Sequence, residues 1–285
     1  MIAFVILHYQ AFDETVNCVK TIFEKVSGDK KVIVVDNLSP NGSGKQLEEK
    51  YKDDPDVNVI LTGKNLGFAK GNNIGYKEAK KYDPDFIVVM NNDVFIQQDD
   101  FTDMVEQAYS SHRFDVLGPD IYSTKINGHQ NPQRARNFTL EELEKKRKFL
   151  EFKNNFKFLL KIKYMFRKKT DAPKSSMDFI DQRKTGVVLH GACYIFSSDF
   201  IKKHDNCFYN ETFMYYESYI LHYLGIREGL ELVYEPSIKV LHHEDVATNQ
   251  TYGKMYSKSV FVNKCLLDSC NCFIKVMKDK NATIG

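Results

Sequence analysis

The sequence predicts an α/β protein with a central, mainly parallel sheet flanked by helices, and two observations support this. Short apolar runs, typical of strands buried on both faces, occur at residues 2–7, 32–35, 57–61 and 86–90. Segments with helical spacing of apolar residues and short polar loops separate these runs. Alternation of strand and helix through short loops is typical of a parallel sheet covered by helices.

The helices are predicted from their caps and their apolar periodicity. Asp13 is expected to cap the first helix. The buried face of that helix would carry Val16, Val19, Ile22 and Phe23. A loop rich in glycine and asparagine, residues 63–73, leads into a helix that ends near Lys81. After residue 184, strand-like runs return at residues 186–189, 194–196, 232–234 and 238–241. A helix is expected over residues 216–228, ended by Gly229, and residues 249–285 are predicted to be helical with a polar tail.

Residues 134–184 differ in composition from the rest and are predicted to form a basic helical insertion. Between residues 145 and 169 the chain carries eleven Lys or Arg and one acid. Apolar residues recur there at roughly helical spacing, at Phe149, Phe152, Phe156, Leu159 and Leu160. Such a helix either lies on an anionic membrane or packs its aromatic face on the domain. No nucleic-acid partner is expected, because no nucleic-acid motif accompanies the basic residues.

Composition narrows the class of protein. The 285 residues have a net charge of +2, and no run of about 18 or more apolar residues predicts a membrane-spanning helix. The first ten residues lack the features of a signal peptide. None of the six cysteines forms a CxxC pair, which favours reduced thiols. We therefore expect a cytoplasmic protein, with peripheral contact to the inner face of the cell membrane through the basic helix.

Two acidic residues directly follow predicted buried strands. Asp36 and Asp93 would lie at one edge of a parallel sheet, where ligands of such folds bind. A carboxylate flanked by Asn91 and Asn92 suits Mg²⁺ or Mn²⁺, which take oxygen ligands, although the same residues are common in turns.

Three further segments have features of a binding or catalytic site. The run NLGFAKGNN at residues 65–73 precedes a helix, and glycines there allow close approach to a phosphate. Glu217, among aromatic residues at a helix start, suits a general base with a raised pKa, or simply complements the helix dipole. His242 at a strand end suits a metal ligand, or is a solvent-facing histidine.

Taken in order, these segments resemble family 2 glycosyltransferases, especially their bacterial rhamnosyltransferase-like branch. The family motifs read roughly VDNxS, NxGFAxGNN, NxD, GA, FxYxED and VxH. The matching segments of this chain begin at Val35, Asn65, Asn91, Gly191, Phe213 and Val240. Together they span about residues 2–245, and NLGFAKGNN is the most specific of them.

The resemblance implies a GT-A fold and an inverting transfer that depends on Mg²⁺ or Mn²⁺. The donor pocket would comprise His8, Tyr9, Asp36, Asn37, Asn65, Gly67, Phe68, Gly71, Asn72, Asn91 and Asn92. Asp36 would hold the pyrimidine base, and Asp93 with His242 would bind the metal. Gly191 and Ala192 would lie near the acceptor. Residues 1–133 would form the nucleotide-sugar-binding half and residues 185–248 the acceptor half of the domain, followed by a C-terminal helical segment at residues 249–285.

The chain departs from the family at the position of the usual base. That acid is replaced by Ser218, which cannot act as a carboxylate base. The acid expected two residues later is Ile220, and the arginine expected after it is Leu224. Either Glu217 acts as the base, or the chain is an inactivated or scaffolding relative.

The expected activity is sugar transfer in bacterial surface-polysaccharide synthesis. The donor would be a UDP- or dTDP-sugar, with dTDP-rhamnose as a candidate, and the acceptor a hydroxyl of a lipid-linked or polymeric glycan. The alternatives are a non-catalytic pseudo-glycosyltransferase and a metal-dependent nucleotidyltransferase or phosphohydrolase.

Overall fold

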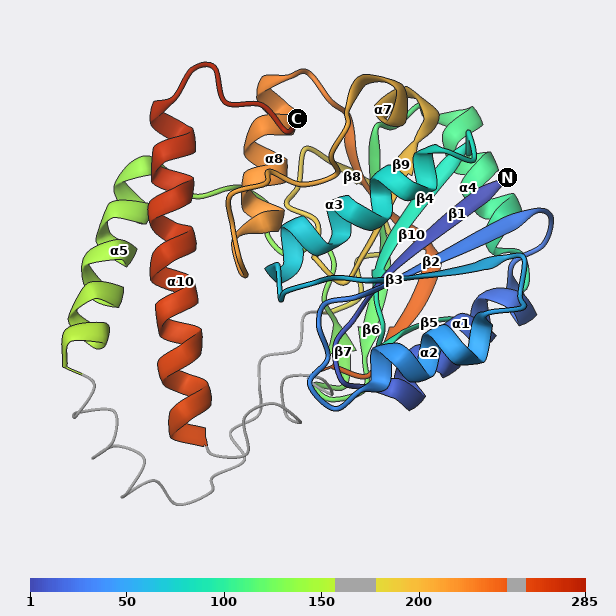
Figure 1. Ribbon diagram of the computed structural model, residues 1–285. Coiled ribbons are helices and arrows are strands. Elements are labelled where there is room, and N and C mark those ends of the chain that lie inside the picture. Colours follow the sequence, from blue (N-terminus) through green and yellow to red (C-terminus); the bar gives the residue numbers. More distant parts are fainter. Residues whose placement is uncertain (157–177, 245–254) are drawn as a thin grey trace.

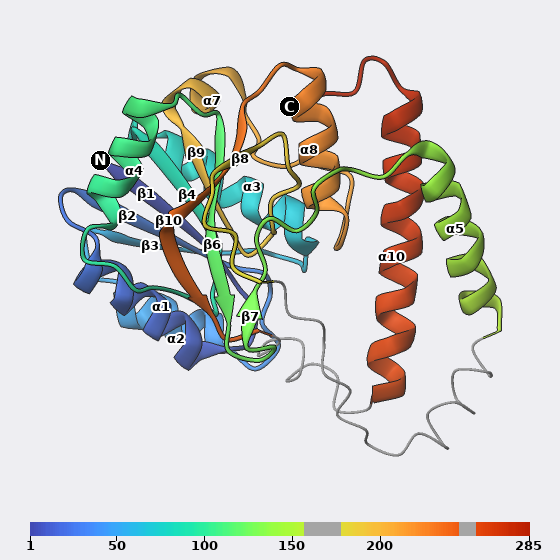
Figure 2. The same cartoon turned by 180° about the vertical axis from the view of Figure 1, so that it is seen from behind.

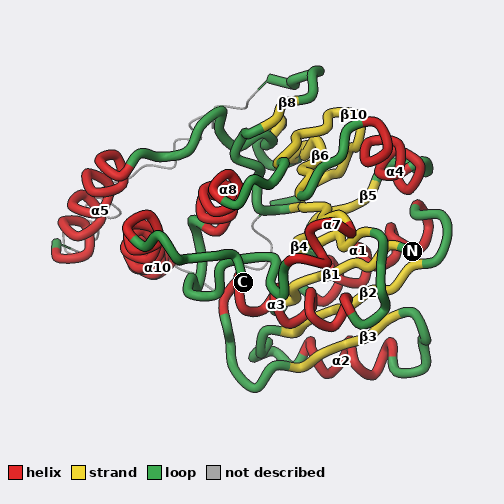
Figure 3. The backbone as a smooth tube through the Cα atoms, turned by 90° about the horizontal axis from the view of Figure 1, so that it is seen from above, coloured by secondary structure: helices red, strands yellow, loops and turns green. Residues whose placement is uncertain are grey.

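A mixed sheet forms the centre of the molecule and has helices on both faces (Figures 1 and 3). The computed structural model describes residues 1–156, 178–244 and 255–285. In chain order its strands are β1 (Ile2–His8), β2 (Lys30–Asp36), β3 (Val57–Leu61), β4 (Phe86–Asn91), β5 (Val94–Ile96), β6 (Val116–Ser123), β7 (Gly128–His129), β8 (Lys184–Thr185), β9 (Cys193–Ser197) and β10 (Leu232–His242).

The strand order is β3-β2-β1-β4-β9-β6-β10-β5. Strands β3, β2, β1 and β4 run parallel, as do β6 and β10. Strand β9 lies antiparallel between β4 and β6 and joins these two parallel groups into one sheet. The predicted fold class, α/β with a mainly parallel sheet flanked by helices, is confirmed.

Each face of the sheet has its own layer of helices (Figure 2). One face is covered by α1 (Phe12–Lys25), α2 (Ser43–Tyr51) and α4 (Phe101–Ser111). The opposite face is covered by α3 (Gly67–Lys80), α7 (Ser198–Lys203) and α8 (Glu217–Arg227). Alternate residues of β1 supply the two cores: Ala3 and Val5 face α3, whereas Phe4 and Ile6 face α1.

Two long helices, α5 (Leu140–Asn155) and α10 (Met255–Lys278), lie side by side at the edge of the molecule (Figures 1 and 2). A capping box between Thr139 and Glu142 begins α5, and Leu143 and Leu150 are its buried residues.

The aromatic residues predicted along this basic segment do not pack on the domain. Phe149, Phe152 and Phe156 are 56%, 52% and 42% exposed, so the packing alternative is wrong for these three. Leu159, Leu160 and the rest of the segment to Lys169 lie outside the described residues. No helix in the described part of the chain is long and apolar enough to span a membrane.

Several element boundaries differ from the prediction. Helix α1 starts at Phe12 after Ala11, so Asp13 is not its cap but a first-turn acid. Phe23, expected on the buried face, is 37% exposed and has the Lys30 ammonium 5.8 Å from its ring centroid. The strands and the helix expected at residues 2–7, 32–35, 57–61, 86–90 and 216–228 are confirmed.

The region around residues 184–242 also differs in detail. No strand covers residues 186–189, because Gly186 has a φ of +63° and turns the chain after β8. Only Val188 makes a bridge there, with Arg134. The two runs expected at 232–234 and 238–241 form one strand, β10, whose register shifts between Glu235 and Lys239. Pro236 lies at this irregularity, where a missing backbone N–H is tolerated.

Candidate active site

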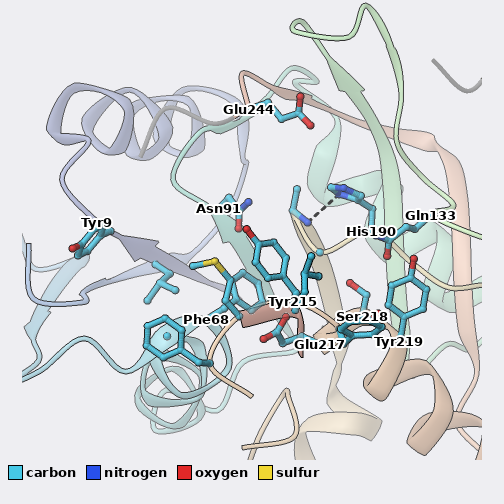
Figure 4. Close-up of a pocket in the computed structure, with 18 of the residues that line it drawn as sticks. Tyr9, Phe68, Asn91, Gln133, His190, Tyr215, Glu217, Ser218, Tyr219 and Glu244 are labelled. Atoms are coloured by element: carbon cyan, nitrogen blue, oxygen red, sulfur yellow. Dashed lines mark hydrogen bonds between the residues drawn. The ribbon is translucent and has the colours of Figure 1, made fainter. Parts of the chain in front are cut away.

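Polar residues gather where the parallel strands end, as the sequence predicts. The last residues of β1 and β2, His8 and Asp36, are paired in register, and Leu7 of β1 pairs with Asn91 of β4. Asp36 and Asp93 therefore lie on the same edge of the sheet. Next to this edge is a cavity of about 620 Å³, walled by loops from both halves of the chain (Figure 4).

Most of the predicted site residues line this cavity. They are Tyr9, Asn37, Asn65, Gly67, Phe68, Asn91, Asn92, Asp93, Gly191, Ala192, Glu217 and His242. The cavity lining does not include four others, His8, Asp36, Gly71 and Asn72, and all four are buried. Their contacts are with the protein, so the structure gives them a supporting place beneath the cavity wall.

His8 and Asp36 hold the loop after β2. The His8 ring nitrogens lie 2.6 Å from the Thr15 hydroxyl and 2.8 Å from the Ser43 hydroxyl. Asp36 accepts hydrogen bonds from the backbone N–H and the hydroxyl of Ser39. Burial lowers the pKa of His8 to about 4, and nearby Asp36 only partly opposes this. These side chains therefore fix the loop that carries Asn37.

Asn37 in turn fixes the glycine-rich loop. Its side-chain oxygen accepts from the Leu66 N–H at 2.7 Å, and its amide nitrogen donates to the Gly67 carbonyl at 3.1 Å. Gly67 has a φ of +78°, and a Cβ there would lie 2.1 Å from the Phe213 carbonyl oxygen. Only glycine allows this approach, in which the Phe68 N–H donates to the Phe213 carbonyl at 2.6 Å.

Gly71 and Asn72 lie inside α3 and pack within the protein, so the loop expected over residues 63–73 is wrong in its second half: the helix already begins at Gly67. A Cβ at Gly71 would lie 2.5 Å from a Leu7 methyl group, so this glycine lets α3 lie close to β1. The Asn72 amide donates to the Phe68 carbonyl at 3.0 Å. The neighbouring Asn73 binds the backbone of Phe208 and Cys207 in the second half of the chain.

Glu217 begins α8 and is presented by two strained residues. Tyr215 and Tyr216 have φ values of +75° and +67°, which bulky side chains rarely adopt and which mark functional segments. Burial raises the pKa of Glu217 to about 7. Its Oε1 is buried and has no hydrogen-bond partner within the described residues. A carboxylate that exchanges its proton near neutral pH and faces a cavity suits general-base chemistry.

The hydroxyl of Ser218, the residue found where the motif resemblance predicts an acid, is hydrogen-bonded to Tyr194. Its hydroxyl lies 2.9 Å from the Tyr194 hydroxyl, and Tyr194 also lies 3.2 Å from the Leu189 carbonyl. A Cβ at Gly191 would be 3.3 Å from the Ser218 hydroxyl oxygen. Ser218 thus forms part of the wall next to Glu217.

Asp93 and His242 face each other at the end of a chain of hydrogen bonds. The Gln130 amide nitrogen donates to Glu244 at 2.9 Å, which turns the Gln130 oxygen toward His242 Nδ1 at 2.7 Å. In the tautomer with its proton on Nδ1, His242 donates to Gln130 and turns the Nε2 lone pair toward the Asp93 carboxylate, 3.3 Å away.

This arrangement fits a divalent cation. Two acceptors that face each other are stabilised by a positive ion between them, and the Asp93 carboxylate is an oxygen ligand of the kind that Mn²⁺ and Mg²⁺ take. The remaining ligands would come from a phosphate and water, because no cluster of three or more His, Cys, Asp or Glu capable of holding a metal occurs in the described ranges.

His190 is a cavity residue that sequence reasoning missed. Its Nδ1 accepts from the Ala192 N–H at 3.2 Å, so the neutral ring carries its proton on Nε2 (Figure 4). Burial, with His242 nearby, lowers the pKa of His190 to about 3 and keeps the ring neutral. Other lining residues not foreseen are Gln133, Phe138, Lys146, Met214, Tyr219, Glu244, Phe261 and Leu266.

Comparison with solved structures shows the class of fold. S. aureus TarS 1–349 in complex with UDP has 15% identity over 85% of this chain and 60% of that chain, with a TM-score of 0.53. Its complex with UDP-GlcNAc has 15% identity over 90% of this chain and 60% of that one, with a TM-score of 0.53. S. aureus TarS itself is matched at 15% identity over 85% of this chain but 36% of its own length, with a TM-score of 0.52. The predicted GT-A-like fold is confirmed, and the chain spans 60%, 60% and 36% of these three solved chains, which is less than two thirds of each.

The sequence comparison then gives the family. The profile of glycosyl transferase family 2 matches residues 3–172, more than half of the chain. The chain therefore belongs to glycosyl transferase family 2. Among curated proteins no relative matches the sequence.

Proposed function

We propose that the chain transfers a sugar from a nucleoside-diphosphate donor to a hydroxyl of a glycan, with inversion at the anomeric carbon. One observation carries this proposal. A single cavity brings the glycine-rich loop and the Asp93–His242 pair together with Glu217, a buried carboxylate whose Oε1 has no partner in the described structure. Donor, cation and base would then meet in one place, as glycosyl transfer requires.

The donor would occupy the side of the cavity near Tyr9 and Phe68, which Figure 4 shows together at one end. Binding of UDP and UDP-GlcNAc by S. aureus TarS supports a uridine donor. A dTDP-sugar, including dTDP-rhamnose, stays a prediction from the motif resemblance.

Glu217 supplies the proton acceptor for the reaction. The acceptor oxygen forms a bond to the anomeric carbon, the bond from that carbon to the diphosphate oxygen breaks, and the hydroxyl proton passes to Glu217. The neutral His190 has an Nε2–H in the cavity that donates to an oxygen of either substrate. Asp93 and His242 would hold Mg²⁺ or Mn²⁺, which supplies positive charge for the departing diphosphate.

Product analysis tests this proposal. Full-length chain is incubated with UDP- and dTDP-sugars, Mn²⁺ and glycan acceptors, and the products are separated. Release of nucleoside diphosphate together with a new glycoside supports transfer. Pyrophosphate or free sugar phosphate instead indicates a nucleotidyltransferase or phosphohydrolase. A parallel thermal-shift screen identifies the donor, because a ligand that binds the folded state raises its melting temperature.

Ser218 gives specific support to a second candidate, a scaffold that binds nucleotide without turnover. The residue offers no carboxylate at the family's usual base position and is bonded to Tyr194. Nucleotide binding with no turnover on any acceptor, together with activity in Ser218→Asp, would favour this candidate.

We also propose that α5 holds the enzyme at the inner face of the bacterial membrane, where lipid-linked acceptors of surface polysaccharides lie. Exposed Phe149 and Phe152 alternate with Lys148 and Lys153, and the Lys153 ammonium lies 4.3 Å from the Phe149 ring centroid. Aromatic and basic side chains on one exposed helix suit binding to an anionic lipid surface.

Charge reversal on α5 is expected to weaken lipid binding. Lys148→Glu with Lys153→Glu should lower partitioning onto phosphatidylglycerol vesicles at least about tenfold, because each basic residue near such a surface contributes about 1 kcal/mol. Vesicle sedimentation measures the effect. The matched control reverses Lys45 and Lys50, exposed residues of α2. Equal losses in both pairs, or none in either, would show that α5 is not the binding surface.

A further inference from the structure

Two cations share one aromatic ring at the edge of the cavity. The guanidinium carbon of Arg134 lies 4.1 Å from the Phe138 ring centroid, and the Lys146 ammonium lies 4.9 Å from it. Phe138 and Lys146 both line the cavity. The Arg134 backbone is fixed by hydrogen bonds with Val188, so the guanidinium extends from an ordered strand-like segment.

Neither cation forms a salt bridge with a carboxylate in the described portion of the structure; Arg134 acts on Glu142 without a hydrogen bond to it, and hydrogen-bonds the Tyr219 side chain. Glu142, one of two acids in the first turn of α5, is already held by Arg136 through hydrogen bonds of 2.7 and 3.0 Å. Lys145, next to Lys146 in sequence, is paired with Glu141 at 2.7 Å. An aromatic ring attracts a cation but does not cancel its charge. Two like charges on one ring also repel each other, and a bound anion removes that repulsion.

The pair of cations lies on the Tyr219 side of Glu217. The Phe138 ring contacts Tyr219 with centroids 4.7 Å apart, and Tyr219 follows Glu217 by two residues on α8. Figure 4 shows Glu217 between Phe68 on one side and Tyr219 on the other. Phe68, at the start of α3, and the Phe138 ring that holds the cations therefore lie on opposite sides of Glu217.

We propose that Arg134, Lys146 and Phe138 form a subsite for a phosphate group carried by the acceptor. This inference rests on the proposed glycosyl transfer and names the acceptor class: a sugar phosphate or phosphodiester whose free hydroxyl reaches Glu217. Arginine binds phosphate through two parallel N–H donors and lysine adds a point charge. Tyr219, which also lines the cavity, offers a ring for contact with the adjoining sugar. The phosphate belongs either to a lipid carrier or to a water-soluble glycan.

Thermal shift of the full chain, saturated with UDP and Mg²⁺, tests the subsite apart from the donor pocket. The probes are glucose 1-phosphate for a soluble phosphate, farnesyl phosphate for a lipid-linked one, and methyl glucoside as the neutral control. We expect a concentration-dependent rise in melting temperature with at least one phosphate probe and none with methyl glucoside. The phosphate probe with the higher affinity identifies the source.

Variants locate the binding. Arg134→Gln and Lys146→Gln should each weaken the phosphate probe about tenfold, and the double variant about a hundredfold, while the shift caused by UDP stays unchanged. Lys145→Gln, on the same helix and already paired, should match the wild type. The variants' melting temperatures without ligand report whether they fold.

Three results would overturn the subsite. They are wild-type protein that responds to UDP but to neither phosphate probe, a double variant that keeps full probe affinity, and a double variant that loses the UDP shift. The last would assign the cations to the donor. Absence of any UDP shift in the wild type would instead count against the proposed function, so the two failures are distinguishable.

Discussion

Glu217→Gln is expected to lower kcat about a thousandfold, because glutamine cannot accept the proton of the acceptor hydroxyl. In the wild type the pKa of Glu217 is raised to about 7, so activity should fall about tenfold for each pH unit below that value. Rate measurements of kcat/KM between pH 5 and 9 report this limb. It should be absent from the residual activity of the variant. His190, whose pKa is about 3, should not contribute a limb in this range.

The same substitution is expected to stabilise the fold at alkaline pH. Because burial raises the carboxyl pKa from 4.5 to about 7, the folded state holds its proton longer than the unfolded state does. The stability of the wild type is therefore fully present below pH 4.5 and declines as pH rises through about 7. Above that pH, Glu217→Gln should be more stable by up to about 3 kcal/mol, measured by urea unfolding at pH 8.

A control substitution on the same segment separates loss of the base from a general effect of mutating this segment. Glu211→Gln changes an exposed acid six residues earlier and should leave the rate and its pH profile unchanged. If Glu217→Gln retained wild-type kcat with the limb near pH 7, Glu217 would not be the base. Activity that appears only in Ser218→Asp would point to the same conclusion.

Asp93→Asn is expected to remove the cation dependence of donor binding and to lower kcat/KM about a hundredfold or more. The amide no longer supplies a negative oxygen opposite His242 Nε2, so the charge that stabilises the leaving diphosphate is lost. UDP-induced thermal shifts with Mn²⁺ and with EDTA measure the first effect. Circular dichroism should show an unchanged fold, since Asp93 lies at a loop facing the cavity.

Asp120→Asn provides the matched comparison. Asp120 is also a buried aspartate paired with a histidine, His129, at 2.7 Å, but it does not line the cavity. Its substitution should leave the Mn²⁺ dependence of UDP binding intact. Wild-type activity that persists in chelator would refute a role for the Asp93–His242 pair in cation binding.

The part of the fold that depends on local sequence could be predicted. Buried parallel strands show as apolar runs, and the polar residues that follow them must share one edge of the sheet, which placed Asp36 and Asp93 correctly. The spacing of residues along the sequence did not reveal which way each side chain points. Asp36 turns toward the Ser39 hydroxyl rather than into the cavity, because a buried carboxylate takes the nearest donors.

The acceptor side was largely hidden in the sequence. Phe138 and Lys146 lie just before and within α5, whereas Phe261 lies far along the chain in α10, and only tertiary packing of α5 and α10 brings them to one cavity. One feature of the sequence could have indicated His190: it directly precedes Gly191 and Ala192, which were expected to lie near the acceptor. Its fixed proton position depends on the Ala192 N–H, which a residue pattern does not reveal.

The bond between the Phe68 N–H and the Phe213 carbonyl links two regions that are distant in sequence. Because Gly67 has no side chain, its backbone lies directly against the backbone of Phe213. Displacement of the loop before α3 is therefore transmitted to the segment that ends at Glu217. Under the proposed function, a nucleotide bound against Phe68 would therefore set the position of Glu217 before the second substrate arrives. The expected kinetic consequence of this backbone contact is a compulsory order of substrate binding, with the nucleotide sugar first.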